Sequence, residues 1–218
     1  SGRCLRQTAY KYHGIEGEGR ELNMRSMINF FLGDVVEIAV VMLAKLAGVP
    51  LLAVGFEQFR IEKEIGDAVL SGYQDGLVVH DGQITILNVK SFSPYKFREF
   101  KKRDVGDEYE GQMQVEMRAL KIPRTIVVGI DKGSGEMHEE FWDHYPKYSK
   151  KLTEGLLLIT NSTPEELPDP KFDYDEKGKL PWQCQYCSHW QLCKPDAEKV
   201  LKSGKYQLVK SEDPESLK

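Results

Sequence analysis

Residues 72–90 read Gly-Tyr-Gln-Asp-Gly-Leu-Val-Val-His-Asp-Gly-Gln-Ile-Thr-Ile-Leu-Asn-Val-Lys. Two apolar runs flank Asp81-Gly82, and a two-residue Asp-Gly turn between such runs is a strong signal for a β-hairpin. Asp75 then opens the first strand, while Asn88 and Lys90 lie near the end of the second. The hairpin is therefore expected to bring an acid, an amide and an ammonium group to one end of a sheet.

The pattern on either side of this hairpin alternates between helical and extended periods. Apolar residues recur at steps of three and four between Asn23 and Ala47, which predicts an amphipathic helix that ends at Gly48-Val-Pro50. We expect an α/β fold, with a central mixed sheet flanked by helices. The expected strands are 51–62, 65–80, 83–90, 124–130 and 137–143, the later helices are 107–120 and 146–160, the segment 161–181 is a loop, and the tail after Ser203 is disordered.

Length and composition bound the class of protein. The chain has 218 residues, of which 40% are hydrophobic, and a net charge of −4. This is enough for one large domain, or for one domain with a small appendage, with its own core. A negative net charge disfavours a surface that grips nucleic acid everywhere, but it permits a local basic channel. We saw no run of about 18 apolar residues and no signal peptide, so we expect no membrane association and a cytoplasmic location.

The polar groups at the end of the hairpin suit phosphodiester hydrolysis. Hard oxygen ligands such as the carboxylate of Asp75 hold Mg²⁺ or Mn²⁺. Such an ion polarises a phosphate and lowers the pKa of a bound water, and a nearby ammonium group such as Lys90 offsets developing negative charge.

The order of these residues resembles the PD-(D/E)xK nucleases, and within them the RecB-like branch that includes the CRISPR-associated Cas4-like exonucleases. Asp75-x12-Asn88-x-Lys90 is similar to the central motif, Gly33-x3-Glu37 to an upstream helical motif, and Gln112 to a glutamine on a later helix. Singly, each has an ordinary explanation as a turn, a solvated charge or a local hydrogen bond. Their joint order is what supports the resemblance, which covers about residues 4–195.

This resemblance implies a restriction-endonuclease-like core and a metal-dependent deoxyribonuclease that processes single-stranded or splayed DNA ends. It further implies Mg²⁺ or Mn²⁺ ligands at Glu37, Asp75, residue 88 and the backbone carbonyl of Val89. Lys90 would orient the attacking water, and Gln112 would help to place the lysine or the substrate. The implied partners are DNA and proteins of CRISPR adaptation or recombination in a prokaryotic or viral cell, with a homo-oligomer also open.

Position 88 departs from the family pattern, which has Glu or Asp there. An amide oxygen can ligate a metal, but it brings no charge. Asn88 could be an engineered inactivating change, a natural variant, or the mark of a degenerate nuclease that binds DNA without cutting it. A non-catalytic DNA-binding or adaptor protein therefore stays open as the alternative function.

The chain has four cysteines, and three of them form a Cys-x2-Cys-x5-Cys cluster. Such clustering without a secretion signal favours metal ligation over disulfides. The segment from Cys4 to Tyr10 resembles the N-terminal cysteine box of the Cas4-like nucleases, which implies an iron–sulfur cluster, [4Fe–4S] before [2Fe–2S], that clasps the two ends of the chain beside the core. Zinc is the alternative, with His189 as a further candidate ligand. The expected cluster ligands are Cys4, Cys184, Cys187 and Cys193, and the expected divisions are 1–22, 23–160, 161–200 and 201–218.

A basic segment follows Lys90 and is the candidate DNA contact. Five cations alternate with three aromatic residues between residues 95 and 103. Cations neutralise phosphates and aromatic rings stack on unpaired bases, although a solvated face or a flexible loop would have the same composition. We expected Trp182 and Trp190 to pack around the cysteine site. The expected DNA-binding residues are Tyr95, Lys96, Arg98, Lys101, Lys102, Arg103 and Tyr109.

Overall fold

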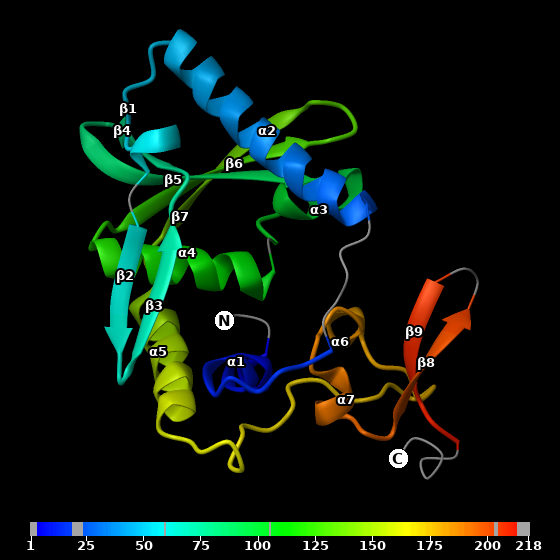
Figure 1. Ribbon diagram of the computed structural model, residues 1–218. Coiled ribbons are helices and arrows are strands. Elements are labelled where there is room, and N and C mark those ends of the chain that lie inside the picture. Colours follow the sequence, from blue (N-terminus) through cyan, green and yellow to red (C-terminus); the bar gives the residue numbers. More distant parts are fainter. Residues whose placement is uncertain (1–3, 19–23, 59, 105, 203–204, 213–218) are drawn as a thin grey trace. The chain divides into compact units, whose positions relative to one another are not determined.

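A computed structural model describes residues 4–18, 24–58, 60–104, 106–202 and 205–212 (Figure 1). The chain divides into two compact units. The sheet unit is Leu22–Thr153, and the terminal unit combines Arg3–Glu21 with Glu154–Lys218. The first and last parts of the chain thus form one unit, and the boundary falls inside the helix α5 (Pro146–Thr160).

A five-stranded mixed sheet is the centre of the sheet unit, which confirms the predicted fold class. Its order is β1-β4-β5-β6-β7, with β4–β5 and β6–β7 antiparallel and β5–β6 parallel. The predicted hairpin joins β4 to β5, and Asp81 and Gly82 both have positive φ (50° and 74°), as a type I′ turn requires. The strands are β1 (Leu51–Leu52), β4 (Gly76–His80), β5 (Gln83–Phe92), β6 (Arg124–Asp131) and β7 (Met137–Asp143).

Helices cover both faces of this sheet (Figure 1). Successive residues of β5 alternate between the two faces. Leu87 and Val89 join one buried cluster with Val40 and Val41 of α2, whereas Ile86 joins another with residues of α3 and α4. The helices are α2 (Met24–Leu46), α3 (Pro94–Phe100) and α4 (Asp107–Leu120).

Helix α2 corrects one expectation. The stretch Ser26–Leu46 is long and apolar enough to cross a membrane by length and composition alone, so the sequence does contain an apolar run of the kind that we took to be absent. The buried core helix of a soluble protein passes the same test, but only 11% of the most apolar window of this helix is buried. Its inner side nevertheless packs on the sheet through Val40 and Val41.

Three segments differ from the predicted elements. The two long strands expected over 51–80 are interrupted: a short 3₁₀ helix (η1, Gly55–Glu57) follows β1, and β2 (Arg60–Ile65) pairs with β3 (Ala68–Tyr73) in a separate ribbon. The basic segment forms α3, because Ser93 caps it by accepting from the amide of Lys96 and Pro94 occupies its first turn. Part of the tail that was expected to be disordered after Ser203 instead forms β9 (Lys205–Lys210), which pairs with β8 (Ala197–Lys202); residues 213–218 lie outside the described part of the chain.

The terminal unit has a small core of its own. Leu180, Ala197 and Leu208 are buried together, and Trp190 packs against them. The N-terminal segment, expected only as a polar stretch with a cysteine, contains helix α1 (Leu5–Tyr12). Two single-turn helices, α6 (Trp182–Gln185) and α7 (Trp190–Cys193), carry the cysteine cluster.

Candidate functional site

Asp75 and Lys90 meet at the end of the β4–β5 hairpin, as predicted. The β4–β5 ladder ends at the pair Gly76–Leu87. Asp75 precedes Gly76, and its side chain, not its backbone, makes the next contact with β5. Its Oδ2 accepts from the amide of Val89 at 2.6 Å and from Lys90 Nζ at 3.3 Å. Both side chains are largely buried, with 16% and 18% of their surface exposed. A carboxylate and an ammonium group are thus held together at the point where the strands separate.

The backbone of Val89 faces the same place. In a β-strand the N–H and C=O of one residue point to the same edge. Because the Val89 amide donates to Asp75, its carbonyl also leaves β5 on the edge of Asp75. This is the orientation that a metal-ligating carbonyl at Val89 would need.

The side-chain amide of Gln58 links Glu37 of α2 to Asp75, and the sequence analysis did not predict this link. Gln58 Nε2 donates to Glu37 Oε1 at 2.8 Å and to the backbone carbonyl of Asp75 at 3.2 Å. Burial raises the pKa of the Glu37 carboxyl, and the negative charge of Asp75 raises it further. Glu37 therefore lies within electrostatic reach of Asp75. No motif marks Gln58, which follows the irregular segment after β1.

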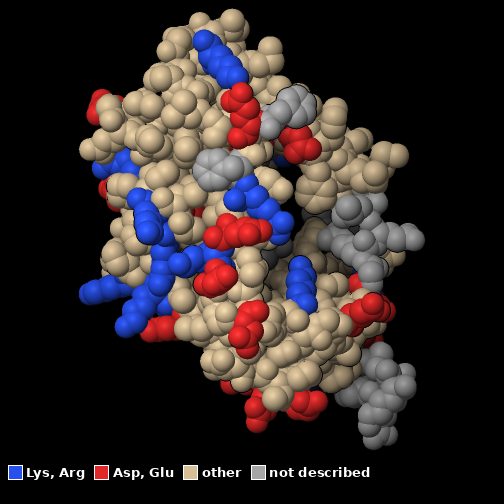
Figure 2. Space-filling view, turned by 60° about the vertical axis from the view of Figure 1, so that its left-hand side comes forward, with Lys and Arg blue, Asp and Glu red and all other residues tan. Residues whose placement is uncertain are grey.

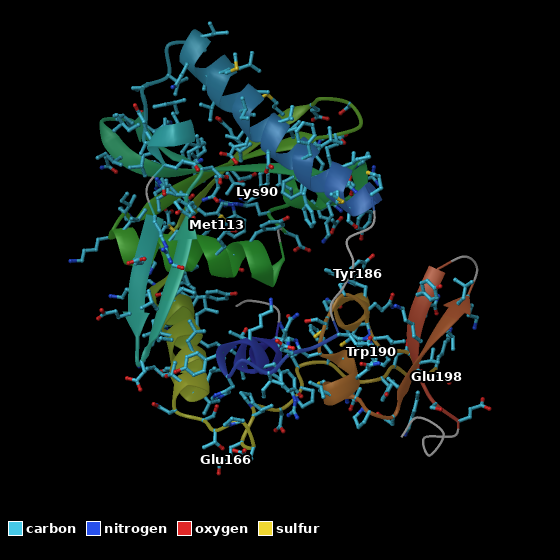
Figure 3. The ribbon with its side chains drawn as sticks, in the orientation of Figure 1. Lys90, Met113, Glu166, Tyr186, Trp190 and Glu198 are labelled. Carbon is cyan, nitrogen blue, oxygen red and sulfur yellow. The ribbon has the colours of Figure 1, made fainter. Side chains whose placement is uncertain are left out.

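Asn88 is fully buried on the face of the sheet that α4 covers. Its Nδ2 donates to Glu116 Oε2 at 3.0 Å and to Thr125 Oγ1 at 3.2 Å. Its Oδ1 is buried and has no hydrogen-bond partner within the described part of the chain. Figure 3 shows Lys90, two residues further along β5, on the side of the sheet where Met113 of α4 lies.

Glu116 is the site residue that the sequence analysis missed. Gln112 donates to Glu116 Oε1 at 2.7 Å, and does so instead of touching Lys90 directly. Burial raises the pKa of Glu116, the hydrogen bonds from Asn88 and Gln112 lower it in part, and the charges of Lys90 and Asp75 also reach it. The available signal was the spacing Gln112-x3-Glu116, which places two side chains on one helical face.

Helix α4 carries a second glutamine, Gln114, two residues after Gln112. Gln114 is buried and holds the end of β7 by donating to the carbonyl of Asp143 and accepting from the amide of Tyr145. Gln114 therefore has a structural role. Gln112 instead points to the polar group around Glu116.

The donor atoms fit a divalent cation that keeps part of its water shell. Within the described residues, no three His, Cys, Asp or Glu side chains lie close enough together to hold one metal ion. That count omits amide and backbone oxygens, however, and the partnerless Oδ1 of Asn88 is a buried acceptor of the required kind. Mg²⁺ is bound in proteins through one or two carboxylates with several waters, so a mixed set of carboxylate and amide oxygens is chemically suitable.

The basic segment is less available for DNA than the sequence suggested. Phe97 and Phe100 are buried in the core beneath α3, and Tyr109 packs edge-on against Phe92, because the alternation of cations and aromatics is that of an amphipathic helix. Tyr95 is the aromatic residue of α3 that stays exposed. Phe97 and Phe100 are therefore not available as stacking platforms, whereas the DNA contact at Tyr109 stays a prediction.

Three of the five predicted DNA-binding cations are already engaged. Ion pairs join Lys101 to Glu136 at 2.9 Å, Lys102 to Glu99 at 3.3 Å and Arg103 to Glu140 at 3.1 Å. Arg98 lies over the ring of Tyr95, and Lys96 is exposed. On the face shown in Figure 2, Lys and Arg side chains likewise lie beside Asp and Glu side chains.

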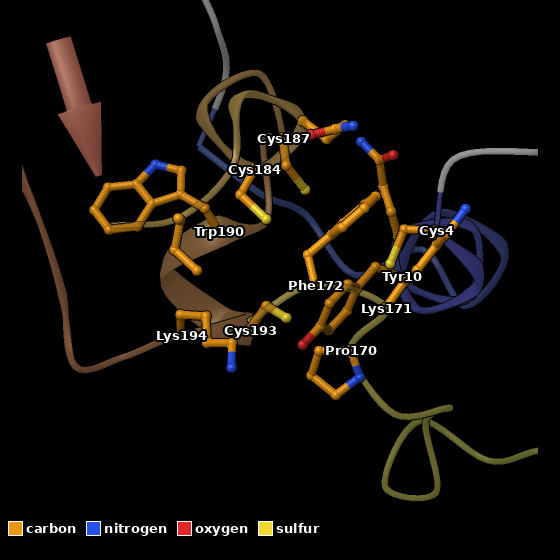
Figure 4. A pocket seen from close by; sticks show the side chains of 13 residues that line it. Cys4, Tyr10, Pro170, Lys171, Phe172, Cys184, Cys187, Trp190, Cys193 and Lys194 are labelled. Atoms are coloured by element: carbon orange, nitrogen blue, oxygen red, sulfur yellow. The ribbon is translucent and has the colours of Figure 1, made fainter. Parts of the chain in front are cut away.

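Four free cysteines line one pocket of the terminal unit (Figure 4). In the close-up view the four sulfur atoms point toward the interior of this pocket. Burial first, and then the neighbouring sulfur atoms of Cys187, Cys193 and Cys4, raise the pKa of the Cys184 thiol to about 12. The four sulfurs thus share one electrostatic environment, although no three of them are close enough for a single ion.

His189 is engaged as a structural residue rather than placed as a ligand. Its ring is 3% exposed and stacks on Tyr10, with centroids 4.9 Å apart. Nε2 bonds to the carbonyl of Ile15 at 2.9 Å, and Nδ1 to Ser188 Oγ at 3.0 Å. Both ring nitrogens therefore have protein partners, so the reason for considering a Cys3His zinc site is removed.

The N-terminal segment packs closely on the cysteine cluster within the terminal unit. A Cβ atom at Gly17 would lie 2.3 Å from the carbonyl oxygen of Ser188, so a glycine is needed there. Gln191 also donates to Glu18 at 2.7 Å. Of the two tryptophans, Trp190 lines the pocket and packs on the small core, whereas Trp182 is 52% exposed.

Comparisons with known proteins give distant structural likenesses. No protein-family model matches this sequence, and no curated protein matches it. A structure described as SSO0001 shares 15% identity with this chain, at a TM-score of 0.48, over 85% of this chain and 79% of its own. The exonuclease LHK-Exo in complex with dAMP shares 16% identity, at a TM-score of 0.48, over 65% of this chain and 69% of its own. The alkaline exonuclease LHK-Exo from Laribacter hongkongensis shares 17% identity, at a TM-score of 0.45, over 65% of this chain and 71% of its own. Likenesses at this level carry no argument about activity, so the function is argued below from the site.

Proposed function

We propose that this chain is a metal-dependent DNA nuclease that processes single-stranded or splayed ends. The observation that carries the proposal is the contact of Asp75 Oδ2 with both the Val89 amide and Lys90 Nζ, at the open end of a β-hairpin. It places an acid, a backbone carbonyl and an ammonium group where a phosphodiester and a cation could meet. The order of motifs in the sequence supports the same reaction.

Each residue has a defined part in the proposed reaction. Asp75, Glu37, the Oδ1 of Asn88 and the carbonyl of Val89 would hold Mg²⁺ or Mn²⁺, which supplies a polarised phosphate and a water of lowered pKa. Lys90 donates to Asp75, which holds its ammonium group where it would orient the attacking water and stabilise negative charge on the phosphate. Gln112 acts through Glu116 rather than through Lys90.

Cleavage of end-labelled single-stranded and splayed DNA with Mn²⁺ tests this proposal. Lys90→Met should reduce cleavage by about 10²-fold or more, because a charge-stabilising donor is lost from the site. Lys63→Met removes an exposed lysine from the β2–β3 ribbon and is the matched control. Equal cleavage by wild type and Lys90→Met would contradict the proposal.

A non-catalytic DNA-binding protein is the second candidate, and Asn88 is the observation that favours it. The amide brings no charge to a position where the resembled family has a carboxylate. The same assay decides between the two functions when Asn88→Glu is included. Cleavage by wild type or by Asn88→Glu supports a nuclease, whereas DNA binding without cleavage by either protein supports the binding function.

We further propose that the four-cysteine pocket holds an iron–sulfur cluster. Four cysteine side chains that line one pocket are a suitable ligand set for a [4Fe–4S] cluster, and zinc is the alternative occupant with the same ligands. Its role would be structural, as a clasp between α1 and the C-terminal segment. Anaerobically purified protein should be brown, with absorbance near roughly 400 nm and matching iron and sulfide content. Colourless protein with stoichiometric zinc would contradict this assignment.

The cellular setting follows the same resemblance and is proposed with it. Proteins of CRISPR adaptation or of recombination would be the partners in a prokaryotic or viral cytoplasm. Co-purification of the intact chain with its genomic neighbours tests this setting independently of the chemistry.

A further inference from the structure

When Glu116 is ionised, the side-chain amide of Asn88 has one orientation. Glu116 presents a carboxylate and can only accept when ionised, so the group of Asn88 that faces it at 3.0 Å is the NH₂ group. The hydroxyl of Thr125 donates to the carbonyl of Ile86, which leaves its lone pairs to accept the second N–H of Asn88. Both donors of Asn88 are thus used, and its oxygen is fixed on the opposite side.

That oxygen is buried without a hydrogen-bond partner among the described residues, as are both polar side-chain atoms of Gln74, the residue before Asp75. An unsatisfied buried acceptor costs about 1–3 kcal/mol. Among the described residues nothing donates to Asn88 Oδ1, while every other polar atom of the amide is bonded. The arrangement leaves one hard oxygen ready to receive a cation.

Glu116 lies directly behind this amide and supplies the charge that position 88 lacks. It is 6% exposed and both of its oxygens accept from amides, Oε2 from Asn88 and Oε1 from Gln112. A carboxylate bonded to the N–H side of an amide draws electron density toward the carbonyl oxygen. Partners of this kind orient metal ligands and raise their basicity, as carboxylates do for zinc-bound histidines.

We propose that Asn88 and Glu116 act as an inverted carboxylate–amide pair. In this pair the oxygen of Asn88 ligates the divalent cation, and Glu116 orients and polarises the Asn88 amide from its N–H side. This inference rests on the proposed function for the location of the cation. It explains how the chain could keep a working centre without a carboxylate at position 88. Glu116 is a positioning residue in this scheme, because it acts through Asn88.

The inversion makes a specific prediction about exchanging the two residues. In the double variant Asn88→Glu with Glu116→Gln, the carboxylate moves to the cation side and the glutamine donates to it from α4. The hydrogen bond between the two positions survives with its direction reversed, and the total charge is unchanged. Each single variant instead alters the charge of the pair.

Mn²⁺ titration of the purified full-length protein, by calorimetry and by the Mn²⁺-dependent rise in Tm, tests the pair without relying on cleavage. Glu116→Gln should weaken Mn²⁺ binding about 10- to 100-fold, which is the usual effect of removing a residue behind a metal ligand. The double variant should recover the affinity of the wild type. Glu139→Gln, which removes an exposed carboxylate from β7 of the same unit, should bind Mn²⁺ as the wild type does.

The outcomes separate this inference from the proposed function. Unchanged Mn²⁺ affinity in Glu116→Gln overturns the pair, as does a loss that the exchanged double variant fails to restore while circular dichroism shows both proteins folded. Absence of Mn²⁺ binding by the wild type also overturns it. If the binding pattern appears as expected but no protein cleaves DNA, the pair stands and the nuclease proposal fails.

Discussion

A double-mutant cycle on Asp75 and Lys90 tests the central contact of the sheet unit. Their charged atoms lie 3.3 Å apart with 16% and 18% of the side chains exposed, between the limits of a surface pair and a buried one. Surface pairs contribute about 0–1 kcal/mol, and breaking a buried pair costs about 3–5 kcal/mol. We therefore expect Asp75→Asn to cost about 1–3 kcal/mol, since the new amide can still accept from Val89 but leaves the Lys90 ammonium without its counter-charge.

The second half of the cycle isolates the pair itself. Lys90→Met alone should cost less than Asp75→Asn, because the carboxylate keeps its bond from the Val89 amide. The double variant should cost about 1–2 kcal/mol less than the sum of the single variants. Urea denaturation without metal measures these values, and hydrogen exchange of the peptide 83–92 reports locally on β5. A coupling below about 0.3 kcal/mol would refute the contact, because independent sites are additive within that range.

Three further predictions concern single residues. Burial raises the pKa of Glu116, so the folded state should lose stability as pH rises from the unfolded value of about 4.3 through the raised pKa. Glu116→Gln should therefore flatten the pH dependence of the urea midpoint above about pH 4.3 without metal, and an unchanged slope would contradict this. Gly17→Ala should destabilise the terminal unit by about 1–3 kcal/mol, because the added Cβ atom would collide with the backbone of Ser188. Hydrogen exchange of residues 184–193 measures this loss, and undiminished protection there would contradict the prediction. His189→Phe keeps a ring against Tyr10 but leaves the Ile15 carbonyl without its hydrogen bond, so it should lower the free energy of unfolding by about 1–3 kcal/mol in thermal unfolding. The metal content of the cysteine site should stay unchanged. Loss of metal from this variant would restore His189 as a ligand.

Local patterns predicted much of the sheet unit. The Asp81-Gly82 turn, the helix α2 and the buried strand β6 were predicted because each depends on residues close together in the chain. The packed side of α2 was not predicted, because Val40 and Val41 are buried while residues of the expected apolar face, such as Phe31, are exposed. The hairpin also explains why the contact of Asp75 with Lys90 could be foreseen. Once a two-residue turn sets the register, it also fixes which residues of the two strands lie opposite each other at the far end of the hairpin.

Other features depended on packing between distant segments. The sequence did not distinguish core aromatics from base platforms in residues 95–103, because an amphipathic helix and a nucleic-acid-binding segment share that composition. Only the packing of Phe97 and Phe100 on the sheet decided it. The β8–β9 hairpin was missed because its polar strands are stabilised by the small core of the terminal unit rather than by a pattern of their own.

The sequence by itself determined which polar groups the β-hairpin would gather and which cysteines could share a site, since turn chemistry and residue type are local properties. Only the tertiary structure decided that Gln58 and Glu116 join that group, because Gln58 bonds to Asp75 across 17 residues of chain and Glu116 bonds to Asn88 across 28. It also decided the meaning of Asn88. Alone, a neutral side chain at this position indicates a weakened metal site. With the carboxylate of Glu116 bonded to it, the same side chain is a polarised ligand in the proposed pair, and that bond forms only because α4 packs on β5.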